Sequence, residues 1–220
     1  MATVSWAAGR AVAHEPVSPV SDEQALEAMA AIEWTGIDAP FGWPEAAVRA
    51  LPAFADRGEW PDAGRDALRF RETDRFVHEK TGIWPLSVSS DRIAVPAWRC
   101  ARLLVSRPVA IDRLGASRVV EVYPGAALTL WGFQRRGYKR SREARALLVA
   151  EIERRAEGWL DLTGARQACV ASDHALDAVL ASLLARAAAR ELTWPPPAGE
   201  VVRREGWIHL PRPGTFDALV

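Results

Sequence analysis

Short apolar runs and longer amphipathic segments alternate along the chain, starting almost at the first residue. The opening stretch "ATVSWAAGRAVAHEPV" holds two short runs on either side of Gly9. This pattern predicts a hairpin in which residues near Val4 and Trp6 pair with residues near Val12. We therefore expect antiparallel strands at the N-terminal end of the fold.

A helix and a strand are predicted after the hairpin. Residues 21–32 read "SDEQALEAMAAI", in which Ser21 precedes Gln24 by three residues, the spacing of a capping box at a helix start. The next segment, "WTGIDAPFGWP" (34–44), begins as a strand, reaches Asp38 and is stopped by a proline two residues later. Asp38 is thus expected at the end of a strand.

The periodic pattern breaks up over residues 44–98. Five prolines alternate there with charged clusters, which predicts an irregular insertion of loops and short helices after the strand that ends at Asp38. The run "AWRCARLLVS" (97–106) is predicted to be helical. The following "SRVVEVYPGAAL" has the composition of a second strand, with Glu121 inside it and Pro124 close behind. A second strand therefore carries a second acid.

Two long helices are predicted in the C-terminal half. Residues 141–159 are amphipathic, whereas residues 172–190 are alanine-rich and apolar almost all round, which predicts a helix buried against a sheet. Residues 191–220 are expected to form a loop, a short strand at "GWIHLP" and a tail. This order of elements predicts an α/β fold, in which a single domain over residues 1–220 is built on a mixed sheet.

Composition and charge exclude several classes of protein. With 49% apolar and 25% charged residues the chain is an ordinary globular mixture, and 28 basic residues balance 28 acidic ones, so any nucleic-acid site must be a local patch. Cys100 and Cys169 are too few for a disulfide framework or a zinc site. The N-terminus lacks a signal-peptide pattern and no segment approaches the roughly 18 apolar residues of a membrane span, so we expect a soluble, cytoplasmic protein without a membrane partner.

The two strand acids each have a structural and a chemical interpretation. Asp38 fits a turn aspartate that bonds its own backbone before a proline, and it also fits a catalytic group, because ligand sites in open α/β sheets form beyond the carboxyl ends of strands. Glu121 lies between two valines, where a carboxylate needs either a partner or a metal ion.

Asp173 and Asp177 lie four residues apart, which puts both on one face of their predicted helix. Asp173 follows the predicted cap Ser172 and fits a residue that complements the helix dipole, whereas Asp177 lies a turn deeper among apolar residues. Carboxylates from two strands and one helix, without histidine or cysteine, make an oxygen site suited to Mg²⁺ or Mn²⁺. Such ions hold phosphodiesters and activate water, which suggests phosphodiester hydrolysis.

A local basic patch lies at "RRGYKRSREAR" (135–145), where Glu143 is the only acid. Its cations are Arg135, Arg136, Lys139, Arg140, Arg142 and Arg145. Tyr138 among them is placed to stack on a base, which favours nucleic acid as a partner, although a solvated helix start has the same composition. In "RETDR", Arg71 and Asp74 either reach a phosphate at the same site or form a surface salt bridge.

Six segments, taken in order, resemble a known family. They are "GIDAPFGWP", "RETDR", "EVYPGAAL", "YKR", "SDHALDA" and "EGWIHLP". This ordered set resembles the family called domain of unknown function 429, which consists of predicted nucleases, and the likeness spans nearly the whole chain. The resemblance implies a ribonuclease H-like mixed sheet flanked by helices.

The resemblance also assigns residues to the site. Those that match the family's acidic positions are Asp38, Glu121 and Asp177, with Asp173 as a fourth member. Those that match its other motif positions are Arg71, Asp74, Tyr138 and Lys139. With the adjacent Arg135 and Arg136, this second set is the predicted substrate-binding group.

Members of that family usually begin with a further strand that ends in an acid. The resemblance implies that this first strand and its acid are missing here, either because the start is assigned too late or because the copy is inactive.

From the acidic residues and the family resemblance, we expect a nuclease of DNA or RNA that depends on Mg²⁺ or Mn²⁺. The alternative is a non-catalytic module that binds nucleic acid or protein on the same scaffold. A kinase or a Rossmann dehydrogenase is disfavoured because the chain has no glycine-rich phosphate loop.

Overall fold

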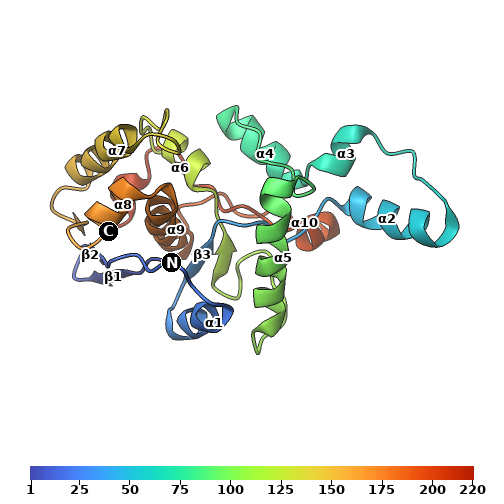
Figure 1. The fold of residues 1–220 in the computed structure, drawn as a ribbon, viewed down its shortest axis with the longest axis horizontal. Helices are drawn as coiled ribbons and strands as arrows, with labels where there is room; N and C mark the ends of the chain where they lie inside the picture. The colour runs from blue at the N-terminus through green and yellow to red at the C-terminus, as the bar shows by residue number, and fades with distance from the viewer.

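The computed structural model describes all of residues 1–220 and shows two small sheets among ten helices (Figure 1). The strands are β1 (Val4–Ala7), β2 (Arg10–Ala13), β3 (Thr35–Ile37), β4 (Val119–Glu121) and β5 (Leu160–Asp161). The helices are α1 (Asp22–Ala31), α2 (Glu45–Arg57), α3 (Arg65–Arg69), α4 (Glu72–Thr81), α5 (Asp91–Ser106), α6 (Pro124–Leu130), α7 (Arg142–Arg155), α8 (Arg166–Ala171), α9 (Asp173–Ala189) and α10 (Glu200–Glu205). None of these helices combines the length and apolar character needed to cross a membrane.

The N-terminal hairpin forms the first sheet, as predicted. Strands β1 and β2 are antiparallel, with Val4 opposite Ala13, and β5 adds to β2 in a parallel arrangement. The two turn residues, Ala8 and Gly9, both have positive φ, which matches the twist that a tight hairpin requires.

The second sheet pairs β3 with β4 in parallel, and Ile37 lies opposite Glu121. Carboxyl ends of parallel strands meet at one edge, so Asp38 follows β3 beside the residue that ends β4. The predicted last strand is reduced to isolated bridges, one of which joins Ile208 to Glu121. The fold is α/β as predicted, but its strands form two small sheets. The prediction of a single mixed sheet is therefore wrong, since β1 and β3 do not pair.

Helix α9 is the centre of the main hydrophobic core and packs against β1, β3 and β4. Its leucines, such as Leu180 and Leu183, are fully buried, which confirms the predicted buried helix. At Gly36 of β3 any side chain would collide with the main-chain carbonyl group of Ala181. Glycine at this position thus allows the strand to approach the helix backbone closely.

The predicted insertion contains longer helices than expected. Helix α5 begins at Asp91 rather than at residue 97 and continues through Pro96, and α2 likewise contains Pro52. Both prolines lie on the exposed side of their helices, where the backbone carbonyl that loses its hydrogen bond reaches water. The prolines therefore interrupt the hydrogen-bond pattern without ending the helices.

Helices α1 and α7 follow the sequence prediction at their starts. Ser21 and Gln24 form the predicted capping box, and Ser141 accepts a hydrogen bond from the amide of Ala144. Helix α6 was not predicted, although Pro124 occupies the first helical position, where proline is favoured. Leu147 of α7 is 74% exposed, although the next residue, Leu148, is buried, because the two lie about 100° apart around the helix.

Candidate functional site

The four predicted acids come together where β3, β4 and α9 meet. Asp38 directly follows β3, Glu121 ends β4, and Asp173 and Asp177 occupy the first turns of α9. Their charges act on one another, since Asp177 and Glu121 add to the desolvation that raises the pKa of Asp38. Asp173 similarly adds to the burial that raises the pKa of Asp177. We call these four residues the acid cluster.

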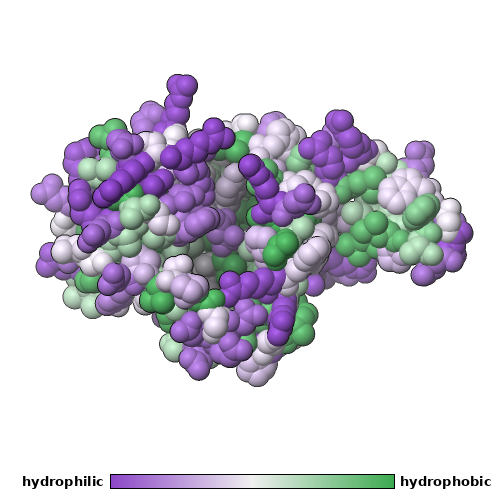
Figure 2. Space-filling model, in the orientation of Figure 1, coloured by the Kyte–Doolittle hydropathy of each residue, from purple (hydrophilic) through white to green (hydrophobic).

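Asp38 is the exposed member of the acid cluster. Its side chain is exposed, yet the surrounding protein desolvates the carboxyl group and, together with the charge of Asp177, raises its pKa to about 7. Figure 2 shows the viewed face hollowed between the lobe that contains α9 and helix α5. Glu121 and Asp177 accept hydrogen bonds from the protein, whereas the Asp38 carboxyl group accepts none, so the turn-aspartate interpretation does not hold.

Asp177 is buried and holds two partners from the loop before α7. One carboxylate oxygen accepts a hydrogen bond of 3.0 Å from the Tyr138 hydroxyl, and the other binds the Lys139 ammonium group. Burial raises the pKa of Asp177, and these two contacts offset only part of that effect. Burial alone would lower the pKa of Lys139, but the attraction of Asp177 outweighs it and the pKa is raised. The cation that Asp177 needed is therefore supplied by the chain itself.

Glu121 is buried and fully hydrogen-bonded. Arg71 donates to both of its carboxylate oxygens, at 2.7 and 2.9 Å, and the Phe41 amide donates at 2.9 Å. Burial still raises the pKa of Glu121, because the neighbouring guanidinium group compensates only part of the desolvation. The partner that the sequence left open is thus Arg71.

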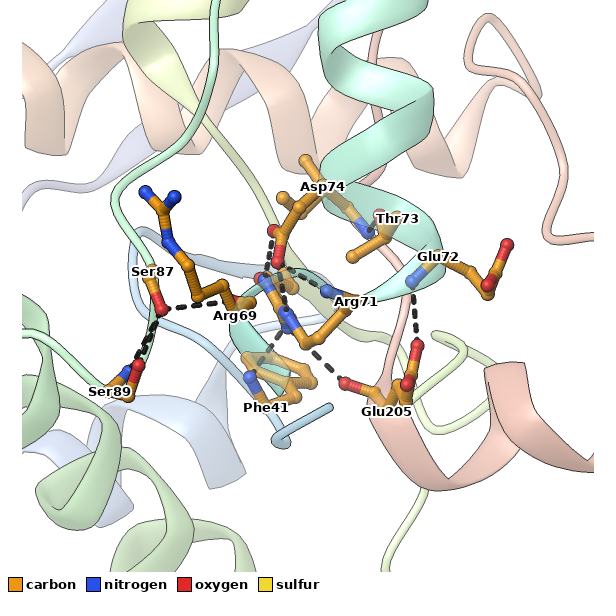
Figure 3. Close-up of polar contacts among 11 residues, drawn as sticks. Phe41, Arg69, Arg71, Glu72, Thr73, Asp74, Ser87, Ser89 and Glu205 are labelled. Carbon is orange, nitrogen blue, oxygen red and sulfur yellow. Dashed lines mark hydrogen bonds and ion pairs between the residues drawn. The ribbon is translucent and has the colours of Figure 1, made fainter. Parts of the chain in front are cut away.

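Arg71 also binds Asp74, as Figure 3 shows. Its remaining contact is the main-chain carbonyl group of Glu205, at 3.3 Å, so all five N–H groups of the guanidinium have an acceptor. Arg71 and Asp74 are 2% and 1% exposed. Of the two alternatives for this pair, the surface salt bridge is wrong, because both residues are buried, where Arg71 also compensates the charge of Glu121. The buried pair also offers a substrate no surface to contact.

Two further residues of the predicted basic patch are also buried. Tyr138 is 2% exposed and points to Asp177, so it is not placed to stack on a base. Arg145 donates to three main-chain carbonyl groups, those of Tyr138, Val170 and Ala171, and thereby fixes the end of α8 to α7. These two side chains are structural, which corrects the expectation from composition alone.

The other cations of the loop line a groove of about 820 Å³. The loop, residues 132–140, lines the groove together with Thr81, the last residue of α4, and Ile83 just beyond it. The cations on the groove are Arg135, Arg136, Lys139 and Arg140. We call this feature the basic groove. Lys139 belongs both to it and to the acid cluster.

Two residues that support the site were not singled out from the sequence. Tyr123, two residues after Glu121, lies near the acid cluster, where burial and the charge of Asp38 raise its pKa. Glu205 accepts hydrogen bonds from the first amides of two helices, Glu45 of α2 and Glu72 of α4. The only available signal for Glu205 was its place at the start of the motif "EGWIHLP".

The sequence model of the family described as "Protein of unknown function (DUF429)" matches residues 1–200. The chain belongs to this family. No curated protein matches it significantly, and neither does any solved structure. Family membership thus confirms the resemblance that the ordered motifs predicted, while the family description assigns no activity.

Within this DUF429 protein, the acid cluster partly fits a divalent cation. The carboxyl group of Asp38 is free and open to solvent, and Asp177 and Asp38 each raise the other's need for a positive charge. Oxygen ligands of this kind suit Mg²⁺ or Mn²⁺. Glu121 does not fit in its present contacts because Arg71 occupies both of its oxygens. As the side chains now lie, no three of the chain's acidic, histidine or cysteine side chains are grouped as a metal site.

Proposed function

We propose that this protein is a divalent-metal-dependent nuclease with a ribonuclease H-like fold that hydrolyses phosphodiesters of DNA or RNA. The observation that carries the proposal is the position of Lys139, which lines the basic groove and also binds Asp177. A polyanion attracted to the groove would therefore be led directly to the acid cluster.

In the proposed mechanism, Asp38 and Asp177 hold the cation, with Asp173 close by. The bound ion would lower the pKa of a water molecule and neutralise charge on the phosphate. Lys139 pairs with Asp177, and if Asp177 held a cation the ammonium group would be free to hold a phosphate at the groove. Arg136 and Arg140, which are exposed, would orient the rest of the strand.

Glu121 stays a predicted ligand in this proposal. It would bind a metal only by exchanging Arg71 for it, since both carboxylate oxygens now serve the guanidinium group. Until such an exchange, the pair fixes β4 relative to α4 and so holds the edge from which Asp38 projects.

Hydrolysis of end-labelled single-stranded DNA and RNA with Mg²⁺ or Mn²⁺ tests the proposal. We expect cleavage that EDTA abolishes and that Asp38→Ala and Asp177→Ala each lower by about 100-fold or more. Asp217→Ala, which alters an exposed acid away from the site, is the matched control and should cleave like the wild type. Cleavage that persists unchanged in both site variants would remove the proposal.

A second candidate function is a non-catalytic module that binds nucleic acid or a protein. It is favoured by the internal neutralisation of two acids, Glu121 by Arg71 and Asp177 by Lys139. This candidate predicts salt-dependent binding of single-stranded nucleic acid without cleavage, weakened in the Arg136→Ala, Arg140→Ala double variant. Absence of binding at low salt would count against it.

The ribonuclease H-like assignment includes one more strand, which the family resemblance implies. In support of it, β1 and β3 each have one edge without a strand partner, and both pack against α9. A strand paired with these two edges would join the two sheets into one and protect their unpaired backbone groups. The test is a chain extended by any in-frame upstream segment: higher stability and activity are expected, and no gain in either would contradict the added strand.

A further inference from the structure

Residues 45–69, which we call the arm, project from the body of the molecule (Figure 1). Between Leu51 and Asp66, every residue except Ala53 and Ala63 is exposed. The arm contains α2, and a helix of this length is marginally stable in water without a packed face. Ala50 is the one buried residue of α2, so most of the helix surface stays uncovered within the chain.

The arm exposes an apolar surface instead of burying one. Val48, Leu51 and Phe54 recur every third residue and so share a face of α2, and Trp60 contacts Phe54 edge-to-face at 5.9 Å between ring centroids. All four side chains are half or more exposed, and Figure 2 shows apolar residues gathered over the arm. We call these four residues the arm face.

Helix α5 carries a second apolar surface. Its buried face holds residues such as Cys100 and Leu104, while Val95, Trp98 and Val105 lie on the opposite side and are each more than 60% exposed. Asp91 and Arg102 flank these three residues, so α5 has an exposed apolar strip bordered by charges in addition to its buried face. We call the three exposed residues the α5 face.

We propose that the arm face of one copy of this chain binds the α5 face of a second copy, and reciprocally, so that the protein is a two-fold symmetric dimer. Within one chain α2 packs on α3 and α10 and does not cover the α5 face. In two copies related by a two-fold axis, the arm face of each copy would cover the α5 face of the other, which gives two equivalent contacts.

The size of the two faces suits a dimer. With half or more of each side chain exposed, the seven residues present roughly 800 Å² of apolar surface per copy. The sum of the two faces is about the area that each partner buries in a standard protein interface.

The charges beside the two faces are complementary. Asp56 and Asp62 on the arm are exposed and form no ion pair within the chain. On α5, Arg92 is likewise unpaired, and Arg102 comes no closer than 3.9 Å to a carboxylate, that of Asp22. Helix α5 as a whole carries three arginines against one acid, whereas the arm carries five acids against four arginines, so the net positive charge of α5 favours contact with the arm over contact between two α5 helices.

Sedimentation velocity of the full chain at about 1 to 100 μM tests the proposal. We expect a dimer, with Leu51→Glu and Trp98→Glu each raising the dissociation constant by about 100-fold or more, because each buries a charge in the interface. Leu147→Glu, at an exposed leucine of α7, is the matched control and should stay dimeric. A monomeric wild type, or a dimer that neither variant weakens, would overturn the proposal.

A cross-linking experiment tests the reciprocal geometry. Phe54→Cys and Trp98→Cys chains are mixed and treated with a short bismaleimide; the natural Cys100 and Cys169 are buried. We expect a covalent dimer in the mixture and little in either variant alone. Efficient cross-linking of Phe54→Cys with itself would instead show arm-to-arm contact and overturn the arrangement. All substituted residues are exposed, so the variants should fold like the wild type. Circular dichroism spectra that match the wild-type spectrum would confirm this.

Discussion

Arg71 is the residue on which most of the buried polar contacts at the site depend. Its guanidinium group pairs with two carboxylates at once, Asp74 and Glu121, and both are as buried as Arg71 itself. A charge removed from such a group leaves its partners uncompensated in a poorly solvated interior. The contacts of Arg71 and Glu121 thus join the start of α4 to β4 and to the segment before α2, so the loss of Arg71 would affect all three.

Replacing Arg71 by alanine should therefore destabilise the protein by about 3 to 5 kcal/mol, because Glu121 and Asp74 would lose their cation. The measurement is urea unfolding at neutral pH. Arg75→Ala, which removes an exposed arginine paired with Glu72, is the control and should cost less than about 1 kcal/mol. Equal losses in the two variants would contradict the central role of Arg71.

His209 provides a pH dependence at the residue scale. Its ring is buried, Nε2 donates to the Leu114 carbonyl group at 3.0 Å, and burial lowers the pKa below its ordinary value of 6.5, although Leu114 and Asp112 oppose the shift. The unfolded chain thus takes up a proton before the folded one as the pH falls. The contribution of His209 to the free energy of unfolding is therefore complete above pH 6.5. It is lost progressively as the pH falls below 6.5 towards the lower pKa of the folded state.

This loss should disappear in His209→Gln, whose side chain does not titrate. We expect the free energy of unfolding of the wild type, measured by urea at several pH values between 5 and 8, to fall faster on acidification than that of the variant. His174→Gln, at an exposed histidine, should follow the wild type. Parallel curves for the wild type and His209→Gln would refute the assignment.

At the scale of elements, the contact between β3 and α9 decides where the acids meet. Gly36 allows the strand to lie against the backbone of the helix at Ala181, and this brings Asp38, two residues on, beside Asp177. Leu180 of α9 and Val120 of the neighbouring strand β4 belong to one hydrophobic core, so the approach is driven by burial, and the glycine sets how close it becomes.

Gly36→Ala should consequently destabilise the fold by about 1 to 3 kcal/mol, since the new methyl group must push β3 away from the Ala181 carbonyl group. Thermal unfolding followed by circular dichroism measures the effect. Gly64→Ala, in open space at the start of α3, is the matched control and should change stability little. A tolerant Gly36→Ala variant would show that the strand moves freely against the helix.

At the scale of the whole molecule, segments far apart in sequence build one polar region. The acid cluster comes from two strands and α9, and the basic groove comes from the loop before α7 and the end of α4. The groove ends at Lys139, where the two meet. The zero net charge of the chain therefore hides a local separation of positive and negative charge.

This arrangement predicts that Mn²⁺ binding stabilises the folded chain. At about 100 times its dissociation constant the ion should add about 2.7 kcal/mol, seen as a higher Tm in EDTA-treated protein on addition of Mn²⁺. In Asp38→Asn and Asp177→Asn the shift should be largely lost, whereas Asp217→Asn should retain it. An equal Mn²⁺ shift in all four proteins would place the ion elsewhere.

Local features of the sequence determined several elements directly. The capping box at Ser21 and Gln24, the hairpin turn at Gly9 and the alanine-rich helix from residue 173 are all encoded within a few neighbouring residues, so their prediction was confirmed. Asp38 could be placed at a strand end for the same reason, whereas Glu121, predicted inside its strand, is the last residue of β4. The ordered motifs also identified the family correctly.

The tertiary structure alone decided which partners these residues have. Arg71 lies 50 residues from Glu121, and no local pattern shows that the two are buried together. Tyr138 and Arg145 look like surface residues in a basic segment. Both are buried, however, and their polar groups need hydrogen-bond acceptors that only the packed fold supplies. The sequence by itself thus determined the elements and the candidate acids, because backbone preferences are local. The pairing of charges depended on burial, which is a property of the whole fold.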